Sequence, residues 1–398
     1  MTSPSFSLTA VVNEFPAPSQ TFIERKLLGL SEAGVDVTVG ATHFTDAVDS
    51  SPFRPLPLVP WRDYRRALDP SNRSSLLASA RSVLNGPGQA QDSRLTAKER
   101  VLFAPLLSNE SDVVHFEFSG IAVTYRRALS QLRPAKIAIS CRGAAEQIVP
   151  RRDPTRGPQL REVFEQADLI HCVSDDIRRT VEDLGAPSDR ILVNRPAVPV
   201  AAFTELALLR EPADGHSELR VLSIGRLHWK KGFDDSLKAI SSLNAGQVDI
   251  EYRIAGEGVE REKLSFLIDE YGLGGRATLL GTCTQDQIRE QLTWADVLLL
   301  PSLSEGISNA VLEAMSSGLP VISTNCGGMR EVIDDGIDGY LVEVGDIEAM
   351  AERLSILGSD PDLRGRLGAA AMKRADLEFD VTRQVGLFLE AYRGILPS

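Results

Sequence analysis

Two glutamates in the second half of the chain have the spacing and the surroundings of a ligand site. Glu305 and Glu313 are eight residues apart and follow Val297–Leu300, an apolar run that predicts a strand buried on both faces of a parallel sheet. Asn309 is placed to cap a helix over 309–317. Because helical side chains lean toward the N-terminus, we expect Glu313 to reach back over the loop that holds Glu305. Two carboxylates beside an anion-attracting helix N-terminus suit a ligand with both hydroxyl groups and phosphate, such as a nucleotide sugar.

Cations that could neutralise such a phosphate follow an earlier predicted strand. Arg226 and Lys231 lie between the predicted strand Arg220–Ile224 and a predicted helix. A guanidinium and an ammonium group would stabilise the negative charge that develops on a diphosphate when a sugar–phosphate bond breaks. We prefer Lys231 to Lys230 because it directly precedes Gly232.

These motifs resemble the family-4 retaining glycosyltransferases with the GT-B fold. Glu305 to Glu313 matches the E-x7-E signature of that family, and Gly225 to Gly232 matches its G-R-L-x(3)-K-G stretch. The resemblance implies that Glu305 contacts the transferred sugar and that Arg226 and Lys231 hold the donor diphosphate. It also implies that Glu313 holds the ribose hydroxyls. The other donor-binding residues that we expect from it are Gly225, Gly256, Gly281, Gly306, Ile307, Ser308 and Asn309.

The first half resembles the same family less completely. Phe-Pro-x-x-Ser-x-Thr-Phe-Ile at 15–23 is similar to the N-terminal loop of members that assemble bacterial exopolysaccharides. Many relatives have a histidine after the strand that corresponds to Lys136–Ser140, whereas this chain reads Cys-Arg-Gly there. Arg142 is therefore our candidate for a catalytic role on the acceptor side. His115, in the predicted strand Asp112–Phe116, is the alternative, and a structural role for it stays open.

Strands and helices alternate in both halves, which predicts an α/β fold with parallel sheets. The predicted strands are Leu8–Val12, Val35–Gly40, Asp112–Phe116, Lys136–Ser140, Asp168–Val173 and Ile191–Asn194, then Arg220–Ile224, Glu251–Ala255, Ala277–Leu280, Val297–Leu300, Val321–Thr324 and Tyr340–Val344. Thr21 and Glu24 predict a capping box for a helix through Glu32. We expect two Rossmann-like doubly wound domains, which the resemblance places facing a cleft.

The expected limits of these domains follow from composition and from the resemblance. Residues 196–219 are rich in proline and poor in periodic apolar positions, so we place a linker there. An acceptor-binding domain is expected over 1–199 and a nucleotide-sugar-binding domain over 200–379. The resemblance implies that a last helix, about 380–398, packs back on the first domain.

Composition excludes several classes of protein. The net charge of −12 over 398 residues argues against a nucleic-acid-binding protein. Four scattered cysteines, no basic stretch before an apolar run at the start, and no window of eighteen apolar residues predict a cytoplasmic protein. The aromatic and basic segment Trp61–Arg66 and the arginines at 151, 152, 156 and 161 read as solvated faces, or as contacts with a membrane surface or an anionic lipid-linked acceptor.

We therefore predict a retaining glycosyltransferase that moves a hexosyl-type sugar from a UDP- or GDP-sugar to a hydroxyl acceptor. The acceptor is expected to be a glycan, a lipid-linked or a small molecule in bacterial polysaccharide or glycoconjugate synthesis, and a peripheral membrane contact is a further expectation. The Asp-Asp pairs at 175, 234 and 334 fall at helix starts or turns, so we expect no metal. The alternatives are a nucleotide-sugar epimerase or hydrolase, or a non-catalytic sugar-nucleotide or glycan-binding protein. A nicotinamide oxidoreductase is disfavoured because Arg261 stands where a dinucleotide fingerprint has its third glycine.

Overall fold

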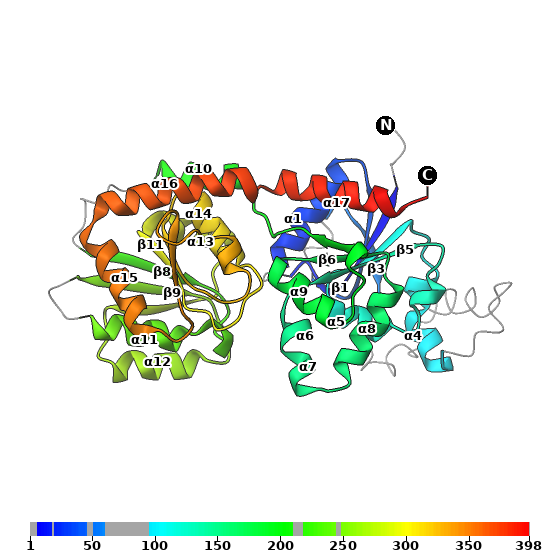
Figure 1. The fold of residues 1–398 in the computed structure, drawn as a ribbon, viewed down its shortest axis with the longest axis horizontal. Coiled ribbons are helices and arrows are strands. Elements are labelled where there is room, and N and C mark those ends of the chain that lie inside the picture. Colours follow the sequence, from blue (N-terminus) through cyan, green and yellow to red (C-terminus); the bar gives the residue numbers. More distant parts are fainter. Residues whose placement is uncertain are drawn as a thin grey trace. The chain divides into compact units, whose positions relative to one another are not determined.

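The computed structural model of the chain describes residues 6–17, 20–45, 51–59, 95–209, 218–243 and 248–397. These residues belong to two compact units, Met1–Asn194 together with Val385–Ser398, and Arg195–Gln384 (Figure 1). The predicted aromatic and basic segment 61–66 lies outside the described residues, as does 210–217 of the predicted linker. The domain limits expected from the sequence remain a proposal.

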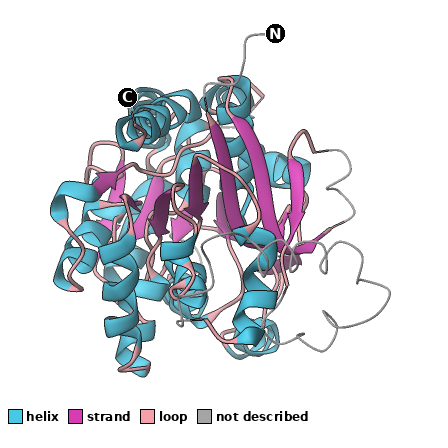
Figure 2. Cartoon of the chain, turned by 90° about the vertical axis from the view of Figure 1, so that its right-hand side faces the viewer, coloured by secondary structure: helices cyan, strands magenta, loops and turns pink. Residues whose placement is uncertain are grey.

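The N-terminal unit contains a seven-stranded, all-parallel sheet in the order β3-β2-β1-β4-β5-β6-β7, with helices on both faces (Figure 2). Its central strands VVHF (113–116) and LIHC (169–172) are buried at every position and are apolar except for one histidine each. The strands are β1 (Ser7–Phe15), β2 (Asp36–Phe44), β3 (Arg54–Pro57), β4 (Val113–Phe116), β5 (Lys136–Cys141), β6 (Leu169–Cys172) and β7 (Ile191–Val193). The helices are α1 (Thr21–Glu32), α4 (Ala97–Leu107), α5 (Ser119–Tyr125), α6 (Ala144–Gln147), α7 (Val149–Arg152), α8 (Arg156–Gln166), α9 (Asp175–Asp183) and α17 (Val381–Ile395).

The C-terminal unit has a six-stranded parallel sheet in the order β10-β9-β8-β11-β12-β13. Its strands are β8 (Leu219–Ile224), β9 (Ile250–Ala255), β10 (Ala277–Gly281), β11 (Val297–Leu300), β12 (Val321–Thr324) and β13 (Gly339–Val342). The helices are α10 (Val200–Ala207), α11 (Phe233–Ser242), α12 (Arg261–Glu270), α13 (Gln285–Trp294), α14 (Asn309–Ser316), α15 (Ile347–Ser359) and α16 (Pro361–Glu378). The strand order reverses between β8 and β11, and ligands of doubly wound sheets bind outside the carboxyl ends of strands at such a point.

The C-terminal helix α17 completes the core of the N-terminal unit. Phe388 and Tyr392 are fully buried, and the Tyr392 ring meets the Phe6 ring edge-on at 6.0 Å between centroids. Gly29 lets α17 approach α1 closely, because a Cβ atom at Gly29 would lie 2.6 Å from Cγ2 of Val385. Residues nearly 400 positions apart in sequence thus share one core.

Helix α16 was missed by the sequence reasoning, and the predicted linker contains a helix. The buried side of α16 is made largely of small residues, and a Cβ atom at Gly368 would lie 2.1 Å from the carbonyl oxygen of Gly318. Close backbone packing therefore replaces the broad apolar stripe that reveals most helices. Within the predicted linker 196–219, Val200, Phe203 and Leu206 of α10 are buried in the core of the C-terminal unit.

Two predicted helix caps were wrong. Thr21 is the first helical residue of α1 rather than its cap, and Gln20 takes the N-cap position without a side-chain hydrogen bond. Likewise Ser308, not Asn309, precedes α14, again without a side-chain cap. In both cases the chain enters the helix one residue earlier than the capping residue type suggests.

Candidate active site

The loops after β8 and β11 bring Lys231 and Glu305 together at the reversal point of the C-terminal sheet. The Lys231 ammonium group donates to Oε1 of Glu305, and the buried Ser302 hydroxyl donates to the same oxygen at 3.0 Å. Both charged side chains keep part of their surface exposed, 21% for Lys231 and 15% for Glu305. Oε2 of Glu305 accepts no hydrogen bond from the described part of the chain, so it can accept one from a ligand hydroxyl group.

Ser302 was not identified as a site residue from the sequence. Its hydrogen bond to Glu305 leads us to expect a measurable loss of activity when it is replaced. Ser302→Ala removes one hydrogen bond to an ionised carboxylate, which orients Glu305 less well, so we expect kcat/KM to fall about tenfold. Steady-state kinetics with the preferred donor measures this. The Ser241→Ala variant, which removes a side-chain to backbone bond of a distant helix, serves as the control and should keep the wild-type value. An unchanged rate in Ser302→Ala would show that Lys231 alone positions Glu305.

Two further basic side chains, Arg226 and Lys230, lie near this pair. Arg226 is exposed and forms no ion pair within the described residues. Burial lowers the pKa of Lys230, Glu305 opposes this shift, and the positive charges of Arg226 and Lys231 add to it. The backbone carbonyl of Lys230 accepts from the N–H of Leu303 at 2.7 Å, which fixes the β8 loop to the β11 loop. Lys230, set aside on sequence grounds, thus belongs to the same positive cluster.

Glycines let the neighbouring loops pack against this cluster. A Cβ atom at Gly256 would lie 1.9 Å from the carbonyl oxygen of Gly225, and the N–H of Gly256 donates to Gly281 at 2.9 Å. The Lys231 side chain crosses Gly225, where a Cβ atom would be 2.9 Å from its Cε. Gly232 has φ +62°, and a Cβ atom there would lie 2.0 Å from the carbonyl oxygen of Pro301. Larger residues at these positions would separate the loops.

The N-terminus of α14 offers a row of hydrogen-bond donors. The backbone N–H groups of Gly306, Ile307, Ser308 and Asn309 donate to none of the residues that the structure describes. Oδ1 of Asn309 is buried and likewise has no partner there. Glu313 lies half-buried in the second turn of this helix. Four free amides at a helix N-terminus can bind a phosphate or the oxygen atoms of a sugar.

Residues 327–331, which read G-G-x-x-E and follow β12, are joined to the start of the C-terminal unit. Glu331 accepts from Nε and Nη2 of Arg195 at 3.1 and 2.8 Å. The N–H of Gly328 donates to the carbonyl of Gly306 at 2.7 Å, so this segment supports the loop before α14. Its contribution is to position that loop.

In the N-terminal unit, Arg142 follows β5 and is held by Glu117, which follows β4. Nε of Arg142 donates to the Glu117 carbonyl and Nη2 donates to its carboxylate, each at 2.9 Å. Arg142 keeps 15% of its side-chain surface exposed, whereas Glu117 is fully buried. Arg142 is thus a fixed, partly accessible cation at the carboxyl edge of this sheet.

His115 lies in the core beneath that edge. Its Nδ1 is hydrogen-bonded to the Tyr392 hydroxyl of α17, and its Nε2 to Ser140 at 2.8 Å. Ser140 also contacts Nδ1 of His171, whose Nε2 lies 2.7 Å from the carbonyl of Asn194. Burial holds the pKa of His115 well below its usual value and lowers the pKa of His171 to about 3. His115 is thus fully buried with both ring nitrogens hydrogen-bonded, as expected of a structural residue, and Arg142 stays the candidate on the acceptor side.

These two histidines predict loss of stability in acid. Each is neutral when folded but takes up a proton on unfolding below pH 6.5, so the unfolded state binds more protons below that pH, and for His171 this window extends to about pH 3. The free energy of unfolding should fall by about 1.4 kcal/mol per pH unit for each histidine in that window. Urea unfolding at pH 7, 6 and 5 measures this slope. His171→Asn should make it shallower, whereas replacing the exposed His43 should not change it.

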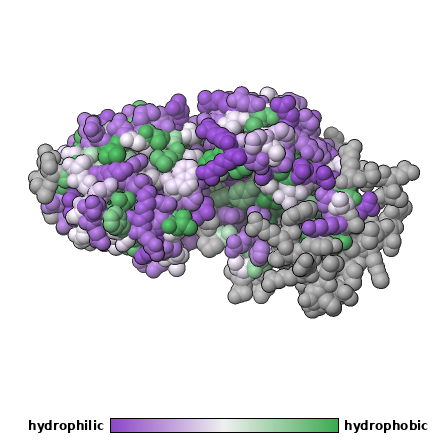
Figure 3. Space-filling view, turned by 90° about the horizontal axis from the view of Figure 1, so that it is seen from below, coloured by the Kyte–Doolittle hydropathy of each residue, from purple (hydrophilic) through white to green (hydrophobic). Residues whose placement is uncertain are grey.

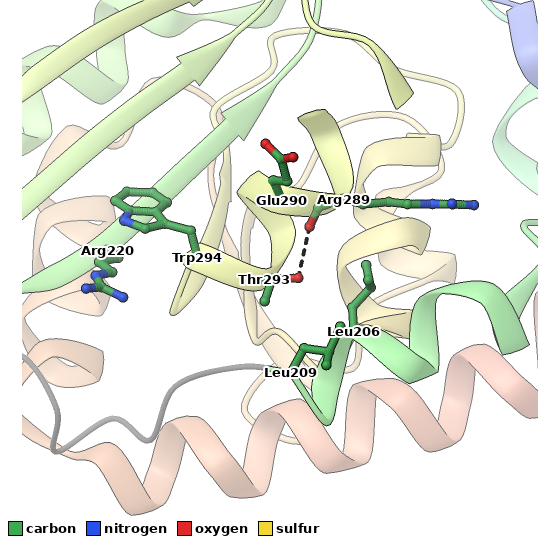
Figure 4. A pocket seen from close by; sticks show the side chains of 7 residues that line it. All are labelled: Leu206, Leu209, Arg220, Arg289, Glu290, Thr293 and Trp294. Carbon is green, nitrogen blue, oxygen red and sulfur yellow. Dashed lines mark hydrogen bonds between the residues drawn. The ribbon is translucent and has the colours of Figure 1, made fainter. Parts of the chain in front are cut away.

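A pocket of about 500 Å³ lies elsewhere on the C-terminal unit (Figure 4). Its lining is Leu206, Leu209, Arg220, Arg289, Glu290, Thr293 and Trp294. Arg220 is near the start of β8 and Trp294 ends α13, so the pocket is at the amino end of the strands. None of the predicted donor residues lines it. The chemistry of the β8, β11 and α14 loops, rather than the presence of this pocket, locates the candidate active site.

Other surface features of the described residues point to no second centre. No helix among them is long and apolar enough to cross a membrane. Figure 3 shows small hydrophobic areas separated by hydrophilic ones on the visible face of the C-terminal unit. No three histidine, cysteine or acidic side chains gather as metal ligands in the part of the chain that the structure describes. All four cysteines are free.

Comparisons with known proteins identify the family of the chain. The family described as Glycosyl transferases group 1 matches residues 210–374, and Glycosyl transferase 4-like domain matches 19–197. WcaL of Salmonella typhimurium, a glycosyltransferase assigned to colanic acid biosynthesis, is 28% identical over 86% of this chain and 88% of its own. The amylovoran biosynthesis glycosyltransferase AmsK of Erwinia amylovora is 28% identical over 96% of this chain and 99% of its own.

Among solved structures, Anabaena Alr3699/HepE in complex with UDP has a similar fold. The TM-score is 0.75 at 14% identity, over 98% of this chain and 99% of that one. Together the two family matches span nearly all of the described sheets. The chain is a group 1 glycosyltransferase of the GT-B fold, and it transfers a sugar from a nucleotide-sugar donor.

Proposed function

We propose that this enzyme moves a hexosyl-type sugar from a UDP-sugar to a hydroxyl group of a bacterial exopolysaccharide precursor, with retention at the anomeric carbon. The observation that carries the proposal is the Lys231–Glu305 pair beside the free amides of α14. Lys231 and Arg226 would bind the diphosphate, and Glu305 would bind the sugar. UDP is preferred to GDP because the Alr3699/HepE structure of similar fold is a complex with UDP.

The proposed mechanism uses the charge that appears when the donor bond breaks. The leaving diphosphate gains negative charge, which Lys231, Arg226 and the amide groups before α14 would stabilise in place. The diphosphate would then accept the proton of the acceptor hydroxyl while the new glycosidic bond forms on the same face. Gly225, Gly256 and Gly281 would let the loops approach the nucleotide, and Glu313 would bind the ribose hydroxyls.

The acceptor class is proposed from the names of the relatives and from Arg142, the partly exposed cation of the N-terminal unit. WcaL and AmsK are named for colanic acid and amylovoran biosynthesis, so a glycan or lipid-linked saccharide is the expected acceptor class. The free cysteines fit the reducing cytoplasm that we predict. Peripheral membrane contact through the arginines of α7 and α8 remains part of this proposal.

Thermal-shift measurements with UDP, GDP, ADP and their common sugars test the donor proposal. A ligand that binds the native state at 100 times its Kd stabilises it by about 2.7 kcal/mol, which raises Tm by several degrees. We expect UDP and one UDP-sugar to raise Tm most, and Lys231→Ala to reduce the shift without abolishing it. A shift by GDP alone would correct the base, and no shift by any nucleotide would contradict donor binding.

Metal dependence gives a separate prediction. Since cationic side chains and amides supply the positive charge at the diphosphate, the transfer rate should be the same in EDTA as in magnesium. Product release measured with the identified donor and acceptor, with and without EDTA, decides this. Activity that EDTA abolishes and magnesium restores would place a divalent cation in the mechanism.

A further inference from the structure

Three charged side chains form a buried triad in the N-terminal unit that the donor chemistry does not use. Lys26 of α1 donates to Oε1 of Glu117, and Arg142 donates to Oε2 of the same carboxylate. Lys26 is 2% exposed, Glu117 is fully buried and Arg142 is 15% exposed. The three charged side chains therefore extend from the core to the surface, and only Arg142 is appreciably exposed to solvent.

The geometry of Arg142 leaves one edge of the guanidinium available. Glu117 occupies the Nε and Nη2 side, through its carbonyl and carboxylate. Nη1 donates to none of the residues that the structure describes, and Nη2 keeps a second hydrogen on the same side. These two nitrogens make the flat fork that binds the two oxygens of a phosphate or carboxylate.

Two aromatic rings fix the plane of that fork. The guanidinium carbon of Arg142 lies 4.5 Å from the centroid of Phe22 and 5.7 Å from that of Phe118. Cation–π contact at these distances orients the group as well as attracting it. Arg142 is thus held on one edge by Glu117 and packs against two aromatic rings, which leaves the Nη1–Nη2 edge for a ligand.

The triad keeps its charges at neutral pH. Burial lowers the pKa of Lys26 to about 8, which still leaves most of it protonated. Burial would raise the pKa of Glu117, but the charges of Lys26 and Arg142 and the hydrogen bond from Lys26 keep it well below its ordinary value. One carboxylate between two cations leaves a net charge of about +1, and that charge faces the surface at Arg142. Burying an ion pair usually adds little to the free energy of unfolding. The triad is therefore better explained by the positioning of the Arg142 guanidinium than by a gain in stability.

We propose that Glu117, held by Lys26, is a positioning residue that presents the Nη1–Nη2 edge of Arg142 to an oxyanion, a phosphate or carboxylate, on the acceptor. The binding of an oxyanion follows from the triad itself, whereas the identity of its carrier as the acceptor rests on the proposed function. The enzyme would then prefer acceptors that carry a negative group near the reacting sugar over neutral glycans.

The test is anion binding to the full-length protein saturated with UDP, so that the donor site is occupied. Inorganic pyrophosphate, inorganic phosphate and acetate are titrated by calorimetry at constant ionic strength. We expect one anion site in the wild type, with pyrophosphate or phosphate bound more tightly than acetate if the carrier is a phosphate ester. Arg142→Gln should abolish this site. Arg133→Gln, which alters the more exposed Arg133–Asp168 pair of the same unit, should not weaken it.

The double variant Lys26→Met/Glu117→Met separates positioning from folding. It removes both buried charges with little change in volume, so Tm and UDP affinity should stay near the wild-type values while anion affinity falls about tenfold. If it fails to fold, Glu117→Gln, which keeps the shape of the side chain, is measured in its place. Wild-type anion affinity in whichever of these folds would overturn the role of Glu117.

The outcome also distinguishes this inference from the proposed function. UDP binding without any Arg142-dependent anion site would contradict the inference alone. Anion binding that depends on Arg142 in a protein that does not respond to UDP would contradict the donor proposal and leave the oxyanion site in place.

Discussion

Lys231→Ala is expected to reduce kcat by about 10²–10³-fold, the scale for loss of one positioned group that stabilises transition-state charge. The Lys231 ammonium group forms an ion pair with Glu305 beside the free amides of α14. The proposed leaving diphosphate would gain its negative charge at this place. Since this charge appears as the donor bond breaks, kcat should change more than the KM for the donor. Steady-state kinetics with the UDP-sugar that gives the largest thermal shift measures both constants.

Variants of Glu305, the partner of Lys231, and of a lysine outside the site test this prediction further. Glu305→Ala should lower kcat on the same scale, and the double variant should lose much less than the product of the two effects, because paired residues act as a unit. Lys238→Ala removes a lysine that pairs with Asp235 on an exposed part of α11, and it should leave kcat unchanged. A Lys231→Ala enzyme with near-normal kcat would remove this residue from the mechanism.

The second large effect is on stability. Glu117→Met leaves Lys26 buried without its counter-ion, and removal of one partner of a buried ion pair costs about 3–5 kcal/mol in the free energy of unfolding. Urea unfolding followed by tyrosine and tryptophan fluorescence measures the loss. Adding Lys26→Met should restore most of the stability, because no fully buried charge then remains and Arg142 keeps part of its surface in solvent. If the single variant is as stable as the wild type, Lys26 is not an ammonium ion in the folded protein.

Local chemistry made much of this fold predictable from the sequence. Val297–Leu300 and Val321–Thr324 are strands at the predicted residues. The first is a continuous apolar run ended by Pro301, and the second is rich in β-branched residues, which favour strands. Gly34, Gly185 and Gly318, which follow helices α1, α9 and α14, have positive φ, as is common for a glycine at a helix end. The spacing of the motifs placed Arg226, Lys231 and Glu305 on loops that a doubly wound sheet must bring to one edge.

Features that depend on distant partners were not predictable. The role of His115 is decided by Tyr392, which lies 277 positions away, and that of Arg142 by the carboxylate of Glu117 and by Phe22. Helix α16 depends on close contact with Gly318, which no local pattern records. Ser302 has the sequence context of an ordinary loop residue, and only the fold shows that its hydroxyl donates a hydrogen bond to Glu305. In each case the missing information is a contact across the fold.

The hydrogen bond from Gln384 to Arg195 has a consequence for protein engineering. Nε2 of Gln384 donates to the Arg195 carbonyl at 2.8 Å, so the first and last residues of the C-terminal unit are neighbours. A segment whose ends meet can be exchanged as a cassette. Transplanting 195–384 between relatives should therefore move donor preference from one enzyme to another and leave acceptor choice with the recipient.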